Sequence, residues 1–166
     1  MRVFGSKERM FFVGLFLVLL VGGCSSQGDK TELKMNFPNA TWNRFAVMDT
    51  AFTINNINKL YDVKVYISVA DGFEHASIPI EMVITSPDGQ ENIINKIVVF
   101  KDKEGKHIGN VFGNTWTIEQ LIYSGKEFYQ EGRYGIFLQN RSQYYDLLGV
   151  ESLTFTVVKS DIKKEK

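Results

Sequence analysis

Alternation of polar and apolar residues constrains the fold of this chain more than any other feature of its sequence. From Tyr61 to Val69 every second residue is apolar. In an extended strand such residues share one face, and that face packs against a core. Ile78–Thr85 repeats the pattern, and Glu91–Phe100 follows after a turn with a proline and an Asp-Gly pair. Because this turn chemistry reverses the chain, we expect the last two segments to form a hairpin.

Several other segments have the composition of short strands. Helical periodicity of any length is missing from the sequence, and only Tyr144–Leu148 is expected to form a short helical turn. Seven or eight short strands separated by turn residues predict an all-β domain, specifically an antiparallel β-sandwich. The remaining predicted strands are Ala51–Ile54, Thr115–Tyr123, Gly132–Gln139 and Leu153–Val158.

Residues 1–23 have the pattern of a secretory signal peptide. Basic residues in the first ten positions precede an apolar run, Phe11–Val21, that is interrupted only by Gly14. A membrane-spanning helix needs roughly 20 apolar residues, so this run is too short to span. It has the length and the basic flank of a signal-peptide core.

The segment Leu20–Cys24 resembles the lipobox of bacterial lipoproteins, in which an aliphatic residue and two small residues precede a cysteine. We therefore expect cleavage before Cys24 and acylation of its thiol. The alternative is a secreted soluble protein with an incidental cysteine. The lipoprotein is favoured because the single cysteine of the chain lies where acylation requires it. Two or three acyl chains anchor a protein firmly, whereas one holds weakly.

We expect one domain after this signal. Residues 24–38 are predicted to be the lipidated cysteine and a flexible tether, residues 39–159 the β-sandwich, and residues 160–166 a frayed tail. Without a second cysteine the mature chain forms no internal disulfide. Lys plus Arg equals Asp plus Glu at 19 each, and no basic stripe is evident, so a nucleic-acid partner is not expected.

Several pieces of the sequence together carry a family resemblance. They are the lipobox cysteine with its short tether, an aromatic-rich lead with Trp42 and Phe52, the Tyr61–Val69 strand, the loop Asp71–Ile78, in which Glu74 and His75 depart from the usual aromatic pattern, the final strand Leu153–Lys159, and four further segments. Asp102–Gly109 is similar to a D-x-x-G-x-W-x-G pattern with His107 in place of tryptophan. Gly132–Tyr134 matches a G-x-Y strand start, and Gln139–Arg141 is similar to Q-x-M-R with Asn140 in place of methionine. Leu147–Val150 is similar to L-x-G-I. With these segments, the chain from about Trp42 to Lys159 resembles the gliding-motility lipoproteins of Bacteroidetes-type bacteria, component H.

The resemblance implies a non-catalytic component or scaffold of the cell envelope. Its implied partners are the membrane, through the lipid on Cys24, and other envelope proteins of the gliding and secretion machinery. It implies no cofactor apart from that covalent lipid. The protein is expected on the inner or outer membrane. No acidic run follows Cys24, which favours a domain that faces the periplasm.

No residue pattern in the sequence predicts an enzyme. The two histidines are 32 positions apart, and the sequence contains neither an HExxH nor a GxSxG motif. Asp88 and Asp102 lie in turn sequences, where an aspartate bonds to the local backbone. We therefore expect no catalytic, cofactor-binding or metal-binding residues.

Aromatic residues suggest a binding surface instead. We predict a protein–protein contact, because exposed aromatic and arginine side chains are typical of interfaces. The alternative is glycan binding, in which aromatic side chains form a platform for sugar rings: Phe73, Phe112, Trp116, Tyr144 and Tyr145. The candidate partner-binding residues are Phe73, His75, His107, Arg141, Tyr144 and Tyr145.

Overall fold

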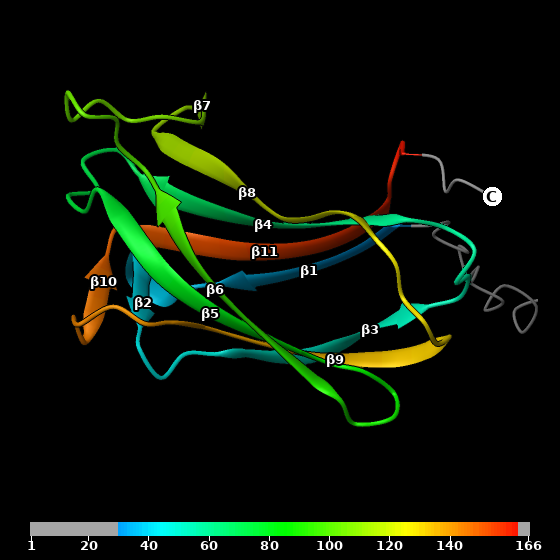
Figure 1. Cartoon of the computed structure of the whole chain (residues 1–166). Coiled ribbons are helices and arrows are strands. Elements are labelled where there is room, and N and C mark those ends of the chain that lie inside the picture. The colour runs from blue at the N-terminus through cyan, green and yellow to red at the C-terminus, as the bar shows by residue number, and fades with distance from the viewer. Residues whose placement is uncertain (1–29, 163–166) are drawn as a thin grey trace, which may run out of the picture.

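The structure, a computed structural model, describes residues 30–162 and is an antiparallel β-sandwich (Figure 1). One short 3₁₀ turn, η1 (Pro38–Ala40), interrupts the strands. The strands of the described residues are β1 (Lys30–Asn36), β2 (Thr41–Asn43), β3 (Met48–Ile54), β4 (Tyr61–Ala70), β5 (Ser77–Thr85), β6 (Glu91–Val99), β7 (Asn110–Phe112), β8 (Thr115–Lys126), β9 (Gly132–Asn140), β10 (Asp146–Leu148) and β11 (Val150–Lys159).

Two larger sheets make the layers of the sandwich. The first has the strand order β1-β11-β4-β8-β7 and the second has the order β3-β9-β5-β6. Strands β2 and β10 form a separate two-stranded ribbon at one end, on the left of Figure 1. This arrangement confirms the predicted all-β antiparallel sandwich.

The alternation in the sequence sets which faces are buried. On β4, the five alternating apolar residues from Tyr61 to Val69 are all buried, and their polar neighbours are only half-buried. On β5, the even-numbered residues from Ile78 to Ile84 are buried in the same way. β5 pairs with β6 from Ser77↔Val99 to Thr85↔Glu91, so the predicted hairpin is confirmed.

Aromatic side chains join the two layers. Phe52 of β3 stacks on Tyr134 of β9 at 5.5 Å between ring centroids, and it also lies 5.5 Å from Phe155 of β11 in the opposite sheet. Phe128, from the connection between β8 and β9, packs edge-on against Phe52 and Tyr134. Edge-on and offset pairs are the favoured arrangements of aromatic rings, so this cluster fixes how the sheets face each other.

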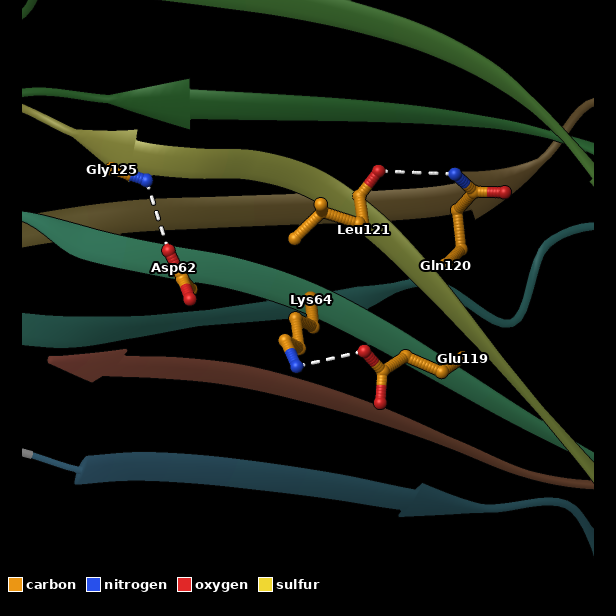
Figure 2. A network of polar contacts seen from close by, with 6 residues as sticks. All are labelled: Asp62, Lys64, Glu119, Gln120, Leu121 and Gly125. Carbon is orange, nitrogen blue, oxygen red and sulfur yellow. Dashed lines mark hydrogen bonds and ion pairs between the residues drawn. The ribbon is translucent and has the colours of Figure 1, made fainter. Parts of the chain in front are cut away.

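A bulge interrupts the pairing of β4 with β8 near Val63. There the Asp62 carboxylate accepts a hydrogen bond from the Gly125 N–H at 2.9 Å (Figure 2). Two residues along β4, Lys64 forms an ion pair with Glu119 of β8 at 2.7 Å. Both contacts link β4 to β8. The Asp62 carboxylate supplies a hydrogen-bond acceptor at the bulge, where the regular backbone hydrogen bonds between the strands are interrupted.

The predicted tether of residues 24–38 is too long. Residues 30–36 form β1, which pairs with β11 from Lys30↔Val158 to Asn36↔Ser152. Inside this strand only the inward-facing residues are half-buried, and charged residues alternate with them, which is why the segment looks like a polar linker. Residues 1–29, with the predicted signal peptide and Cys24, lie outside the described residues.

Two further expectations are wrong. Tyr144–Leu148 forms no helical turn, because its last three residues are β10, paired with β2. The expected frayed tail begins too early, since Ser160 is buried and its N–H donates to the Leu60 carbonyl at 2.8 Å. Residues 163–166 of that tail lie outside the described range. Among the described residues, eleven strands replace the predicted seven or eight, because β2, β7 and β10 have only three residues and leave no periodic signal, and because β1 looks like a polar linker.

Candidate partner-binding surface

The two-stranded ribbon is a rigid base at one end of the sandwich. Leu147 of β10 pairs with Trp42 of β2, and both side chains are buried. The Trp42 indole stacks on Phe37 at 5.0 Å and donates from Nε1 to the Ala46 carbonyl at 2.8 Å. Because side chains alternate along a strand, the next residue, Leu148, points outward and is 68% exposed.

A short loop after β2 presents an exposed phenylalanine. Asn43 holds this loop, because its Oδ1 accepts from the Phe45 N–H at 2.9 Å while its Nδ2 donates to Asp146 Oδ1 at 2.8 Å. The Arg44 N–H donates to the Tyr145 carbonyl at 2.8 Å. As a result, Phe45 meets Tyr145 edge-on at 5.3 Å, and the two side chains are 68% and 60% exposed.

A second aromatic contact lies next to this pair in the chain. The His75 ring lies 4.6 Å from Tyr144 and 5.3 Å from the buried Phe73, whose own ring packs on Phe100. Phe73 therefore supports the surface from beneath, and His75 and Tyr144 form its outer part. We call this surface the aromatic end and define it by the residues Phe45, His75, Tyr144, Tyr145 and Leu148.

A hollow of about 440 Å³ opens at the aromatic end. It lies between the loop after β4 and the β10 segment, and Gly149 forms part of it at a positive φ of 86°. Asp71, Glu74 and Asp146 bring carboxylates to its lining, beside His75. Lys101 Nζ donates to the Glu74 carbonyl at 3.1 Å, so one ammonium lies beside the three carboxylates. The hollow therefore combines aromatic walls with an excess of negative over positive side chains.

The hairpin before β8 explains the D-x-x-G-x-W-x-G resemblance in physical terms. Asp102 Oδ1 accepts from the N–H groups of Glu104 and Lys106 at 3.0 and 2.8 Å, and Gly105 takes a positive φ of 80° in this turn. His107, at the tryptophan position of the pattern, stacks on Trp116 at 5.3 Å with a 20° angle between the rings. Asp102 is thus a turn residue, as predicted.

The predicted site residues do not form one cluster. The structure brings His75 and Tyr144 into contact at the aromatic end, and it places His107 against Trp116 on the β8 side. Arg141 follows β9 on the other sheet, exposed, with its Nε 4.0 Å from Glu81. Phe73 is buried, so it supports the surface and offers no contact area.

Phe45 and Leu148 are among the most exposed apolar side chains of the aromatic end, and neither is predicted from the sequence. Leu148 follows a leucine that is buried, and nothing in the sequence says which of the two points inward. The signal is the alternation within β10, which becomes readable only once the pairing of Leu147 with Trp42 is known.

A second exposed apolar surface lies on β6, which is an edge strand of the described sheet. Ile93, Ile97 and Val99 point outward from it and are exposed. Lys96 is a charged residue on the same edge, and an edge lysine is a common device against pairing with another chain. This edge is therefore a weaker candidate for a docking surface than the aromatic end.

No grouping of reactive side chains stands out in the part of the chain that the structure describes. Within residues 30–162, no three His, Cys, Asp or Glu side chains lie where they could hold a metal ion. Asp88 accepts from the Ser86 hydroxyl, which lowers the pKa of Asp88, and from the Gln90 N–H at 3.3 Å. It is a turn residue, as predicted. None of the described helices has the length and apolar character needed to cross a membrane.

Comparison with known families identifies the family of this chain. The family model described as "GldH lipoprotein" matches residues 31–157, from the first residues of β1 to the end of β11. The chain belongs to the GldH lipoprotein family. Membership makes it a lipid-anchored protein of the cell envelope and confirms the resemblance found in the sequence. No curated protein matches the chain.

Solved structures give only distant likenesses to this GldH-family protein. Dimeric latent PorU from Porphyromonas gingivalis is 8% identical over 84% of this chain, which covers 14% of PorU, with a TM-score of 0.36. Two structures of the Tobacco streak virus coat protein are 7% and 11% identical. They match over 87% and 86% of this chain and 96% and 94% of their own, with TM-scores of 0.24 and 0.26. Scores this low establish no shared fold with this chain.

Proposed function

We propose that this GldH-family protein is a non-catalytic component of the gliding and secretion machinery that binds another envelope protein through its aromatic end. The observation that carries the proposal is the exposure of Leu148 on the β2–β10 ribbon together with Phe45 and Tyr145 in the loops next to it. Interface cores are enriched in aromatic side chains, which bring large contact area at low entropic cost. Asn43 and the buried Trp42 hold this surface in place before any partner arrives.

The lipid anchor supports the same function. Acylation of Cys24 confines the domain to a membrane surface, and confinement raises its effective concentration for other envelope proteins without tight binding. A scaffold or stabilising component needs no convergent catalytic groups. We expect a domain that faces the periplasm.

The geometry of the rings favours a protein partner over a glycan. A flat platform for sugar rings presents open aromatic faces to the solvent. Phe45 and Tyr145 meet at 82°, and His75 and Tyr144 are tilted by 45°. In each pair one ring thus turns an edge toward the face of the other, and we infer that this irregular surface suits a protein partner better than a flat sugar ring.

In-cell crosslinking and pull-down of the full-length protein, followed by mass spectrometry, tests this function. We expect envelope proteins of the gliding or secretion machinery to be recovered with the wild-type chain and lost with Cys24→Ala. Recovery of the same proteins with both chains would contradict a role for the anchor. An empty pull-down together with a positive glycan array would replace the proposal by glycan binding.

A further inference from the structure

The course of β1 determines which end of the sandwich lies near the lipid anchor. Lys30 pairs with Val158 at the end of β11, and Asn36 pairs with Ser152 near its start. The start of β11 follows the β10 strand of the aromatic end directly. The described chain therefore enters the sandwich at the end opposite the aromatic end, on the right of Figure 1.

The chain between the anchor and the domain is short. Cys24 stands six positions before Lys30, and six residues span at most about 20 Å when fully extended. The sandwich is longer than this, because the ten residues of β4 alone span about 33 Å at roughly 3.3 Å per residue. If the aromatic end faced its own bilayer, Lys30 would lie farther from the lipid than the tether allows.

A second copy of the chain does not fit the aromatic end. Two aromatic ends that meet face to face would place their Lys30 ends on opposite sides of the pair, whereas two copies anchored in one leaflet need both on the same side. Two copies that pair through their β6 edges in antiparallel fashion meet the same obstacle. Such pairing turns one copy end over end, so its Lys30 end points away from the membrane that anchors the other copy. These symmetric pairings are therefore ruled out for copies anchored in one leaflet, which favours a different protein as the occupant.

The charge of the hollow selects the chemistry of that protein. Asp71 and Glu74 are exposed at its rim, and Asp146 lies on its β10 side. A guanidinium or ammonium group binds well where carboxylates and aromatic rings converge, through charge-assisted hydrogen bonds and contact with ring faces. His75 and Tyr144 supply the rings.

We propose that the aromatic end is a membrane-distal docking face whose hollow receives an Arg or Lys side chain of a protein partner. This inference rests on the proposed function and specifies it further. Lys30 lies level with Asp62 through Val158, so the face, which lies beyond Ala70, is eight residue steps or roughly 26 Å from the residue that leads to the anchor. It thus engages partners that extend away from the anchoring bilayer.

The test uses a photo-crosslinking amino acid, p-benzoylphenylalanine, in the full-length lipidated chain in cells. It replaces Tyr145 at the aromatic end in one variant and Tyr129 in a matched control. Tyr129 is 79% exposed in the β8–β9 connection, at the anchor end. We expect a protein adduct at Tyr145 with at least 10-fold higher yield than at Tyr129. The crosslinked partner peptide is expected to contain or adjoin a Lys or Arg.

Charge reversal tests the hollow itself. Asp71→Lys combined with Glu74→Lys is expected to lower the adduct yield at Tyr145 at least 10-fold. Glu131→Lys, an exposed acidic residue near the anchor end, is expected to leave it unchanged. Matching thermal melts of all variants show that the fold is intact.

Several outcomes overturn the inference. Equal adducts at both positions, or an adduct at Tyr145 with lipid, a glycan or a second copy, contradict the docking face. An adduct that is indifferent to charge reversal contradicts the cationic partner. If Tyr145 yields no adduct while the pull-down still recovers envelope proteins, this face is wrong and the proposed function stands. If both fail, the proposed function fails as well.

Discussion

Replacing Gly109 by alanine tests how the hairpin before β8 is held. Gly109 has a positive φ of 98°, and an added Cβ would lie 2.6 Å from the Thr117 carbonyl oxygen and in close contact with Ile118 Cδ1. The isoleucine tip can move, but the carbonyl belongs to β8, whose Thr117 pairs with Asn110. Gly105 in the same hairpin is a matched control, because it has a φ of 80° and no atom within 4 Å of an added Cβ.

The two substitutions differ by the steric overlap alone. An L residue at positive φ costs about 1–2 kcal/mol, and replacing glycine recovers about 0.4–1 kcal/mol from the unfolded state. Gly105→Ala should therefore destabilise by about 1 kcal/mol. Overpacking adds about 1–3 kcal/mol, so Gly109→Ala should destabilise by about 3 kcal/mol in total.

Urea denaturation of the chain from Ser25 onward, without the acylated cysteine, measures this difference. With a slope of about 2 kcal/mol per molar urea, the midpoint should fall by about 0.5 M for Gly105→Ala and about 1.5 M for Gly109→Ala. Equal shifts would refute the role given to Thr117. An unchanged midpoint for Gly109→Ala, with faster amide exchange over residues 106–114 only, would show that the hairpin moves aside and is not fixed by β8.

Four further outcomes follow from the structure. Asn140 is buried and its amide has no hydrogen-bond partner among the described residues, so Asn140→Met should stabilise by about 1–3 kcal/mol; a lower melting temperature would contradict this. Glu119→Gln removes the surface pair between the exposed Glu119 and the half-buried Lys64 and should cost at most about 0.5 kcal/mol at pH 7. The Lys64 ammonium lowers the pKa of Glu119, and the Glu119 carboxylate raises the pKa of Lys64. The pair should thus make its full contribution to the free energy of unfolding between pH 4.5 and pH 10.5, the ordinary pKa values of Glu and Lys. That contribution should be lost as pH falls through the lowered pKa of Glu119, and also as pH rises through the raised pKa of Lys64. Urea titrations at several pH values measure how much unfolding free energy Glu119→Gln removes. A loss that stays the same below and above both pKa values would refute the ion pair. Cys24→Ala should abolish palmitate labelling and release the protein from membranes, and persistent labelling would exclude acylation at this thiol. Asn43→Ala should cost about 1 kcal/mol and lower the Tyr145 adduct yield, since it frees the loop that carries Phe45; an unchanged yield would show that the loop needs no such support.

The sequence predicted the elements whose pattern is local. Strand β4 and the β5–β6 hairpin are readable because their alternation extends over nine or ten residues and their turn contains a proline and an Asp-Gly pair. Asp88 and Asp102 were identified as turn residues for the same reason, since each bonds to N–H groups a few positions away. Strand β1 was missed because its charged residues hide a weakly buried face.

The sequence by itself determined the all-β class, the inward faces of the long strands and the match to a lipoprotein family. Only the tertiary structure decided the aromatic end. Its ribbon pairs Asn43 with Asp146, which are 103 positions apart along the chain. Each of its two strands has only three residues, too few to show an alternation of polar and apolar residues. Whether Leu147 or Leu148 is buried depends on that distant partner. The binding surface therefore arises from long-range pairing, whereas the sandwich that carries it arises from local alternation.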